Sequence, residues 1–370
     1  MPTAPPVPNP RGGALDALRF AAAFLIVAYH YLFQAPLDPG ALAPAFQRGY
    51  LATDFFLMLS GFVLARAYGS RVVAGRLSWG DFMLRRVKRI WPPHLMVLAA
   101  FVLLIEAAAA MGVWPQQPEL FRWPALVAQA LLVQVLGIEA GGWNTVTWSL
   151  SALVVCYAAF PPLWRLQTRL GAPWLGLAMA AGVLAGADLL CAAGLGKSLY
   201  DLPMHLSLIR ALPLFVLGLA LARVAGERPL PQWAAAAAGA GALALLVLVQ
   251  VIGRFDGLSI ACIAAVILAA GSRPVARPWP FAAFGARLSF SLFLTHLLVA
   301  TVWFGGAHAL EARLTLPAEA RWALWWASFP LALLGAVVFD RWADQPLQRW
   351  LNRDRSAGRA AEALAAARPS

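Results

Sequence analysis

The chain carries little charge for its length. Of its 370 residues, 12% are charged and 61% are hydrophobic. A water-soluble domain carries about twice that share of charged residues. The shortage of charge therefore excludes an ordinary soluble enzyme and indicates a polytopic membrane protein.

Cysteine is also scarce. Cys156, Cys191 and Cys262 stand alone within apolar segments, and their spacing matches neither a disulfide framework nor a metal site. We expect no metal. The N-terminal segment MPTAPPVPNPRGG lacks the layout of a signal peptide, and we expect residues 1–13 to form a disordered cytoplasmic tail.

What the chain has in quantity is apolar segments, most of them about 20 residues long. That length spans the roughly 30 Å hydrocarbon core of a bilayer as a helix. Ten such segments lie near residues 14–34, 50–68, 90–112, 146–164, 174–195, 207–224, 233–252, 258–271, 281–304 and 320–341. The segment 123–137 is shorter and contains Gln129 and Gln134, which predicts a re-entrant or interfacial helix. The predicted fold is all-α, a membrane bundle of about ten transmembrane helices, because a helical bundle satisfies every backbone polar group internally.

Basic residues outnumber acidic ones, 29 to 17, and they gather at the ends of the apolar segments. With the N-terminus in the cytoplasm, ten spans put twenty basic residues on the cytoplasmic side and six on the other side. This agrees with the positive-inside rule. We therefore expect a multi-pass protein of the inner (cytoplasmic) membrane with both termini cytoplasmic, a membrane domain over 14–350 and a basic tail over 351–370. The net charge of +12 then reflects orientation in the membrane and does not indicate nucleic acid binding.

The first apolar segment is interrupted by Asp16, Arg19 and His30. Arg19 and His30 are eleven residues apart, about three helical turns, so both project from nearly the same face, ~16 Å apart along the axis. An arginine within a membrane costs on the order of 3 kcal/mol and usually faces a protein interior or a wet cavity. Two interpretations are open. The pair is functional, or Arg19 extends to the interface and His30 is an ordinary core histidine.

The predicted topology brings polar residues of four spans to a similar depth near the outer side. These residues are His30, Asp54, the Trp148-Ser149 pair and His296. A buried neutral imidazole suits proton abstraction, and Asp54 would orient it if the two lie close together. The alternatives are that Asp54 is a helix N-cap and that His296 hydrogen-bonds a neighbouring helix.

Cationic residues gather at the inner side. They include Arg19, Arg287 and the run from Arg85 to Arg89. Arginine binds phosphate bidentately, so this side suits a phosphorylated cytosolic ligand. The alternative is that the run from Arg85 to Arg89 only fixes the topology. Ser60-Gly61 and the Gly/Ala-rich runs predict close helix packing.

Taken together, these stretches resemble the acyltransferase-3 family of integral-membrane O-acyltransferases. Arg19 and His30 match the family's Arg-x10-His motif, and Arg86 with Arg89 matches its Arg-x-x-Arg motif. Six blocks carry the resemblance in family order: LDALRFAAAFLIVAYH, GYLATDFFLMLSGFVLARAY, DFMLRRVKRIWP, WNTVTWSLS, ARLSFSLFLTH and DQPLQRW.

The resemblance implies transfer of an acyl group, commonly acetyl, from acyl-CoA to a hydroxyl of a glycan, lipid-linked glycan or similar acceptor. It implies that His30 is the catalytic histidine. Asp54 and His296 match polar positions that recur in the family's second-span and ninth-span blocks, and we predict that they belong to the catalytic site with His30. It implies that Arg19, Arg86 and Arg89 are needed for activity, and we predict that they bind the donor. For the fourth-span block we predict that Trp148, Ser149 and Tyr157 bind the acceptor.

One block departs from the family pattern. Leu153 and Val154 stand where the family often has two glutamates. Either those carboxylates are dispensable in this branch, or the acceptor differs, or activity is impaired. The rival functions are a transporter or flippase of a lipid-linked sugar and a non-catalytic membrane scaffold.

Overall fold

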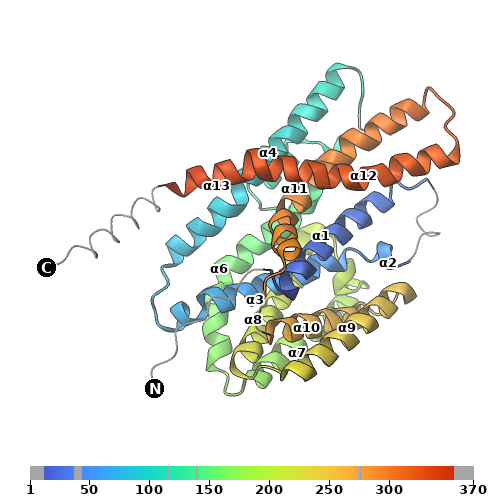
Figure 1. Ribbon diagram of the computed structural model, residues 1–370. Coiled ribbons are helices and arrows are strands. Elements are labelled where there is room, and N and C mark those ends of the chain that lie inside the picture. The colour runs from blue at the N-terminus through green and yellow to red at the C-terminus, as the bar shows by residue number, and fades with distance from the viewer. Residues whose placement is uncertain are drawn as a thin grey trace.

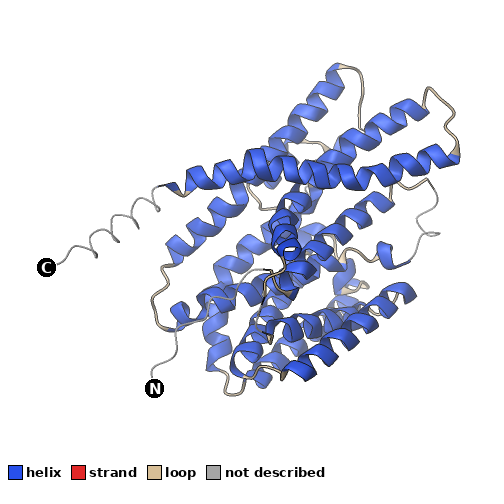
Figure 2. Cartoon of the chain, in the orientation of Figure 1, coloured by secondary structure: helices blue, strands red, loops and turns tan. Residues whose placement is uncertain are grey.

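The computed structural model describes residues 12–36, 44–115, 117–138, 141–273, 275 and 277–353. Over these residues the regular structure is entirely helical (Figures 1 and 2). Most of the two predicted tails, residues 1–11 and 354–370, lies outside the described residues. The all-α prediction is confirmed.

Thirteen α-helices follow one another along the described part of the chain. They are α1 (Ala14–Leu32), α2 (Pro44–Gln47), α3 (Leu51–Val73), α4 (Trp79–Ala110), α5 (Trp123–Ala130), α6 (Trp148–Arg169), α7 (Pro173–Leu195), α8 (Leu208–Glu227), α9 (Gln232–Ile252), α10 (Asp256–Gly271), α11 (Pro280–Glu311), α12 (Ala318–Phe339) and α13 (Gln345–Leu351). A π-helical turn, Asp340–Asp344, joins α12 to α13, and 3-10 turns lie at Pro118–Leu120 (η2), Thr145–Thr147 (η3), Leu199–Asp201 (η4) and Met204–Leu206 (η5).

Nine helices in the described part of the chain are long and apolar enough to cross a membrane. The remaining predicted span, 258–271, corresponds to α10, which is apolar but has only 16 residues. Helix α5 has eight residues, about 12 Å, and is too short to cross a bilayer. The protein is therefore a membrane-embedded multi-pass bundle of the predicted kind.

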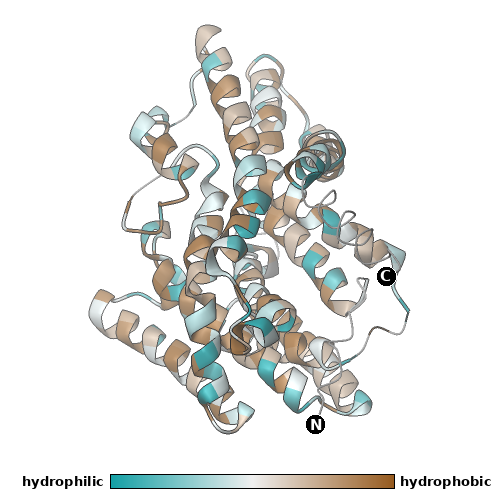
Figure 3. Cartoon of the chain, turned by 90° about the vertical axis from the view of Figure 1, so that its left-hand side faces the viewer, coloured by the Kyte–Doolittle hydropathy of each residue, from teal (hydrophilic) through white to brown (hydrophobic). Residues whose placement is uncertain are grey.

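The surface of the long helices is apolar. Figure 3 shows hydrophobic residues along most of their length and hydrophilic residues at scattered positions. Leu103 of α4 and Leu190 of α7 are 71% and 75% exposed. Such side chains would be costly in water, and in this bundle they face the bilayer.

Small residues set the closest helix contacts. Helix α3 packs along α8, and a Cβ atom on Gly61 would lie 2.2 Å from the backbone oxygen of Phe215. A Cβ atom on Gly218 would lie 1.9 Å from the oxygen of Met58. The two backbones touch because neither glycine has a side chain, which confirms the predicted packing role of Gly61.

Two ends of the bundle matter for the site. We call the end with α2 and the α11–α12 turn the α2 end, and the opposite end, with the α3–α4 turn and α13, the α13 end. In Figure 1, α12 and α13 form one long rod between these ends. Helices α1 and α11 pack side by side and run parallel, both starting toward the α13 end.

Candidate active site

Two histidines meet where α1 packs on α11. His30 and His296 each lie sixteen residues beyond the first residue of their helix, which puts them at the same depth because the helices are parallel. His296 Nε2 lies 3.4 Å from His30 Nδ1, and the ring centroids are 5.0 Å apart. His296 is fully buried, whereas His30 is partly exposed. The structure thus joins two histidines that are 266 positions apart in the sequence.

Backbone carbonyls fix which ring nitrogen carries the proton. His30 Nδ1 lies 2.8 Å from the oxygen of Ile26, and His296 Nδ1 lies 2.8 Å from the oxygen of Phe293. A carbonyl only accepts, so each Nδ1 must donate. In the neutral rings each Nε2 therefore carries the lone pair, and that of His296 faces the Nδ1–H of His30. The Nε2 of His30 is left as the basic atom of the pair.

Neighbouring side chains hold the backbone around this pair. The hydroxyl of Tyr31 donates to the oxygen of His296 at 2.9 Å, and Trp325 Nε1 donates to the oxygen of Tyr31 at 2.8 Å. The amide of Asn144 donates to the oxygen of Leu294 at 2.9 Å. These bonds tie α1, α11, α12 and the segment before α6 together at the histidines.

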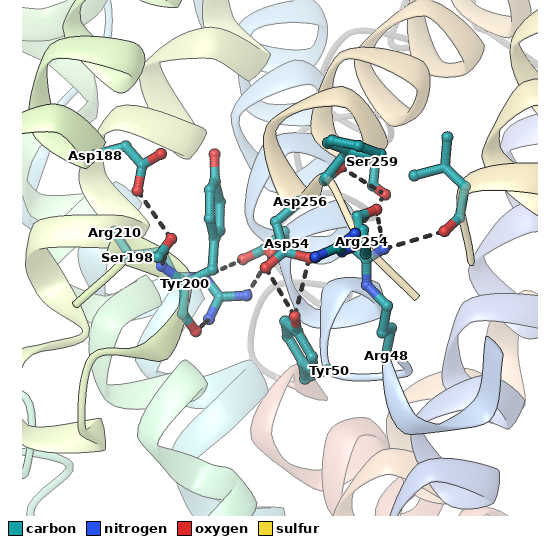
Figure 4. Close-up of polar contacts among 12 residues, drawn as sticks. Arg48, Tyr50, Asp54, Asp188, Ser198, Tyr200, Arg210, Arg254, Asp256 and Ser259 are labelled. Atoms are coloured by element: carbon teal, nitrogen blue, oxygen red, sulfur yellow. Dashed lines mark hydrogen bonds and ion pairs between the residues drawn. The ribbon is translucent and has the colours of Figure 1, made fainter. Parts of the chain in front are cut away.

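Asp54 has a different partner from the predicted one. Its carboxylate, fully buried on α3, forms a two-pronged ion pair with Arg210 of α8, in which Nε lies 2.7 Å from Oδ1 and Nη2 bonds Oδ2 (Figure 4). Neither histidine ring is among its described hydrogen-bond partners. The N-cap alternative is also wrong, because α3 begins at Leu51 and Asp54 lies inside the helix. Asp54 therefore does not orient His30 in this structure.

The Asp54–Arg210 pair belongs to a larger polar network at the α2 end (Figure 4). Arg210 Nη1 donates to the oxygen of Tyr200 at 2.8 Å, and its guanidinium lies 5.6 Å from the ring of Tyr50. Tyr50 donates to Asp256, which also binds Arg48. Burial raises the pKa of Tyr200, and the carboxylate of Asp54 raises it further, so this phenol stays neutral beside the ion pair.

The network approaches the histidine pair through aromatic rings. The ring of Tyr29 lies 5.0 Å from the ring of His30 and 6.0 Å from that of Tyr50. The ring of Tyr29 thus lies between the ring of His30 and that of Tyr50, which belongs to the charged network. Among the described residues, the hydrogen-bond neighbours of the His30 imidazole are Ile26 and His296, and neither belongs to this network.

Arg86 lies toward the α13 end in an aromatic setting. Its Nη2 donates to the hydroxyl of Tyr68 at 2.7 Å, and its guanidinium lies 5.0 Å from the Tyr68 ring and 6.0 Å from the Tyr157 ring. Its Nε is buried without a partner, and no described carboxylate pairs with it. The positive charge of Arg86 is therefore not neutralised by a described carboxylate, and an anionic ligand can bind to it.

Arg89 is held differently. Its Nη1 lies 2.7 Å from both oxygens of Asp344, a buried residue of the π-helical turn. The guanidinium lies 4.7 Å from the ring of Phe290. Phe290 precedes His296 by six residues, about 9 Å along the axis of α11. The two arginines of the Arg-x-x-Arg motif therefore differ. Arg86 has no described carboxylate partner, whereas Asp344 balances the charge of Arg89.

Arg19 and Tyr157 lie close to the same cluster. Arg19 is 3.9 Å from Asp16, and the ring of Tyr157 lies 6.0 Å from the guanidinium of Arg86. Tyr157, predicted to bind the acceptor, thus lies beside Arg86. Nine residues of helix, about 14 Å, separate it from Trp148, so these two residues lie in different parts of the bundle.

Comparison with known proteins places this geometry in a family. A family model described as an acyltransferase domain matches residues 13–341. The chain belongs to the acyltransferase-3 family. The acyltransferase MdmB of Streptomyces mycarofaciens is 34% identical over 182 residues, 46% of this chain and 44% of that protein. Protein 2 in the picA locus of Rhizobium radiobacter is 29% identical over 180 residues, 46% of this chain and 91% of that protein. No solved structure matches the chain.

The fourth-span block of this acyltransferase is built into the bundle. Ser149 is buried, and its hydroxyl donates to the oxygen of Val146 at 3.2 Å. Trp148 is partly buried against the core. Leu153 is buried in that core and Val154 packs against it, so the positions where the family often has glutamates have apolar surroundings here. A carboxylate at either position would be removed from water, which is costly, so the apolar side chains suit these surroundings.

Sequence reasoning missed the residues that hold the α5 segment. His94 and Trp91 of α4 donate to the oxygens of Gln129 and Ala130, at 2.9 Å and 2.7 Å. Ser151 donates to the oxygen of Leu132 at 2.6 Å. A helix that ends inside a bilayer leaves carbonyls that need such donors. The pattern Trp-Pro-Pro-His, which puts donors in an otherwise apolar span, was the available signal.

Proposed function

We propose that this acyltransferase moves an acyl group, most simply acetyl, from cytosolic acyl-CoA to a hydroxyl of a cell-surface or lipid-linked glycan or a similar acceptor. The observation that carries the proposal is the orientation of the histidine pair. The Nδ1–H of His30 is fixed by Ile26 and faces His296, which leaves His30 Nε2 as a base. The family membership supports the reaction class.

The reaction follows from that orientation. His30 Nε2 removes the proton of the acceptor hydroxyl as its oxygen attacks the thioester carbon. A C–O bond forms, the C–S bond breaks, and the departing CoA thiolate takes the proton back from His30. The imidazolium that forms in between is stabilised by its two Nδ1 neighbours, the oxygen of Ile26 and the Nε2 lone pair of His296. A covalent acyl-His30 intermediate that carries the acyl group to the acceptor is a variant of the same chemistry.

The arginines suit the phosphates of the donor. In this proposal the α13 end and both termini are cytoplasmic, the membrane is the inner membrane, and acyl-CoA enters from that side. Arg86 would be the principal phosphate ligand because no described carboxylate neutralises it, with Arg19 and Arg89 contributing beside it. The pantetheine arm would run past Tyr157 and Phe290 toward His30. The acceptor would arrive from the α2 end, near Trp148 and Ser149.

The test is a mass-spectrometric comparison of surface glycans and lipids. Three otherwise identical cell lines would carry the wild-type chain, the His30→Ala variant or no chain, with equal protein levels for the first two. We expect one glycan or lipid species to gain the mass of one acyl group only with the wild-type chain. An acylated species of equal abundance in the His30→Ala cells would contradict the proposed role of His30.

A further inference from the structure

An apolar cavity of about 660 Å³, which we call the aromatic slot, lies between α1 and α12 in the half of each helix nearer the α2 end. Its walls include Phe24 and Ala28 of α1, and Trp322, Trp326 and Phe329 of α12. None of the described residues that line it is charged. Trp326 is 61% exposed, so the slot borders the surrounding bilayer. Its volume is in the range of small-molecule sites, roughly 300–1,000 Å³.

The slot lies on the side of α1 that faces away from the catalytic candidate. Ala28 of its wall is two residues from His30, about 200° around the helix. The buried ring of Tyr31 lies 5.5 Å from the ring of Phe329 in the wall and 6.4 Å from the ring of His296. A molecule bound in the slot is separated from His30 by α1 itself and by Tyr31. We therefore assign the slot to neither substrate of the acyl transfer.

A second, polar cavity of about 200 Å³, the polar pocket, lies at the α2 end. Trp325 lines both cavities, and the wall of the pocket also contains His308, Glu311 and Arg321. Arg321 Nε lies 3.5 Å from a carboxylate oxygen of Glu311. These two side chains remain 45% and 30% exposed, so each can take a further partner. An apolar slot within the bilayer thus ends at one guanidinium and one carboxylate.

We propose that the slot and the pocket together hold one phospholipid of the bilayer, with an acyl chain in the slot and a phosphate and a primary ammonium, as in phosphatidylethanolamine, in the pocket. The guanidinium of Arg321 donates to the phosphate, and the ammonium donates to the carboxylate of Glu311. A choline headgroup has no N–H donor for that carboxylate. An anionic headgroup places its negative charge beside Glu311 without an ammonium to balance it. The paired charges of the pocket therefore favour the ethanolamine headgroup.

The side chain between the two cavities is hydrogen-bonded toward the histidine pair. Trp325 Nε1 donates to the oxygen of Tyr31 at 2.8 Å, and the hydroxyl of Tyr31 donates to the oxygen of His296 at 2.9 Å. These two bonds link α12 through α1 to α11. A lipid that packs against Trp325 stabilises this link from the side opposite His30. The proposed lipid is thus a resident structural ligand of the bundle.

Native mass spectrometry of the full chain in detergent tests the site. Phosphatidylethanolamine, phosphatidylcholine and phosphatidylglycerol with identical acyl chains are titrated at equal concentrations. We expect one phosphatidylethanolamine per chain to be retained with about fivefold higher apparent affinity than the other two lipids, the value of one partly exposed charge-assisted hydrogen bond. Equal retention of the three lipids, or a second copy of the chain bound in place of a lipid, would overturn the proposal.

Two matched pairs of variants locate the headgroup and the acyl chain. Glu311→Gln should abolish the preference for phosphatidylethanolamine, and Glu319→Gln should leave it unchanged, because Glu319 is exposed at the start of α12 and lines neither cavity. Trp326→Ala should weaken retention of all three lipids about fivefold, the value of one aromatic contact. Trp233→Ala, at a residue 77% exposed on α9, should leave retention unchanged. Equal effects within either pair would contradict the assigned site.

Thermal unfolding tests the structural role separately from catalysis. A ligand that binds only the folded state raises the unfolding midpoint, so phosphatidylethanolamine should raise it more than phosphatidylcholine does. The wild-type chain and the His30→Ala variant should gain equally, because the slot lies behind Tyr31, whereas Trp326→Ala should lose most of the gain. Equal midpoints of the wild-type chain in the two lipids would overturn the structural role, whatever the acyl transfer activity of the His30→Ala variant.

Discussion

Two buried polar clusters lie within the same bundle, and they differ in what they leave unpaired. In the Asp54–Arg210 pair, both carboxylate oxygens and three guanidinium nitrogens are bonded. In the His30–His296 pair, both Nδ1 atoms are bonded, but no described residue hydrogen-bonds the Nε2 of His30. The first cluster is saturated and holds α3 to α8. The second keeps one basic atom for a ligand.

The contrast shows how to separate structural from functional polarity in a membrane interior. A buried charge pair persists only when its hydrogen-bonding capacity is filled. A general base needs the opposite, a lone pair held in place with no partner of its own. By this criterion His30 remains the catalytic candidate, and we expect Asp54 to be a structural residue.

The largest expected effect is the loss of acyl transfer when His30 of the histidine pair is replaced. His30→Ala should reduce acyl transfer by roughly 10²–10⁴-fold, the usual contribution of a general base, without lowering the thermal unfolding midpoint. Transfer is measured as incorporation of a labelled acyl group from acyl-CoA into the membrane fraction. His205→Ala, which replaces a histidine outside the His30–His296 pair, is the control. A variant that unfolds at a much lower temperature would instead make His30 a structural residue.

Breaking the Asp54–Arg210 pair should lower the thermal stability of the protein. Arg210→Ala leaves the carboxylate of Asp54 buried and unpaired, which costs about 3–5 kcal/mol, so the thermal midpoint in detergent should fall sharply. The double variant Asp54→Leu with Arg210→Met, which removes both charges, should recover most of that loss and retain acyl transfer. If the double variant is stable but inactive, the pair has a catalytic role and the comparison fails.

The two arginines of the Arg-x-x-Arg motif allow a sharper test at the α13 end. Arg86→Gln should raise the KM for acyl-CoA by about 10–100-fold, the value of one charge-assisted hydrogen bond. Arg89→Gln should lower the thermal midpoint as well, because it leaves the buried carboxylate of Asp344 without its partner. Steady-state kinetics and thermal unfolding of both variants distinguish these outcomes. Identical behaviour of the two variants would show that Asp344 does not separate their roles.

The smallest effect is expected at His296. Replacing His296 with Asn removes the acceptor that faces His30 Nδ1, one hydrogen bond of about 1 kcal/mol, or roughly fivefold in rate. The loss should appear in kcat and not in the KM for acyl-CoA. In the His30→Ala background the same replacement should change transfer little, because the ring that it supports is gone. Additive losses would mean that His296 acts independently of His30.

The sequence by itself determined the membrane class, the approximate spans and the family. Apolar length and the placement of basic residues depend only on hydrophobic thickness and on local composition, so segments such as α9 and α12 were readable without a structure. The segment 123–137 was predicted to be re-entrant or interfacial because it is short for a span and contains Gln129 and Gln134. The predicted roles of His30 and Arg86 came from spacing within single helices and from family resemblance.

Only the tertiary structure decided which polar residues meet. The sequence placed Asp54 near His30 by depth, but depth leaves the rotation of each helix about its axis open. The packing of α3 against α8, set by Gly61 and Gly218, turns Asp54 toward Arg210. In the same way α1 and α11 bring His30 to His296, and the π-helical turn brings Asp344 to Arg89. Partners between distant spans are fixed by interhelical contact, which no periodicity within one helix encodes.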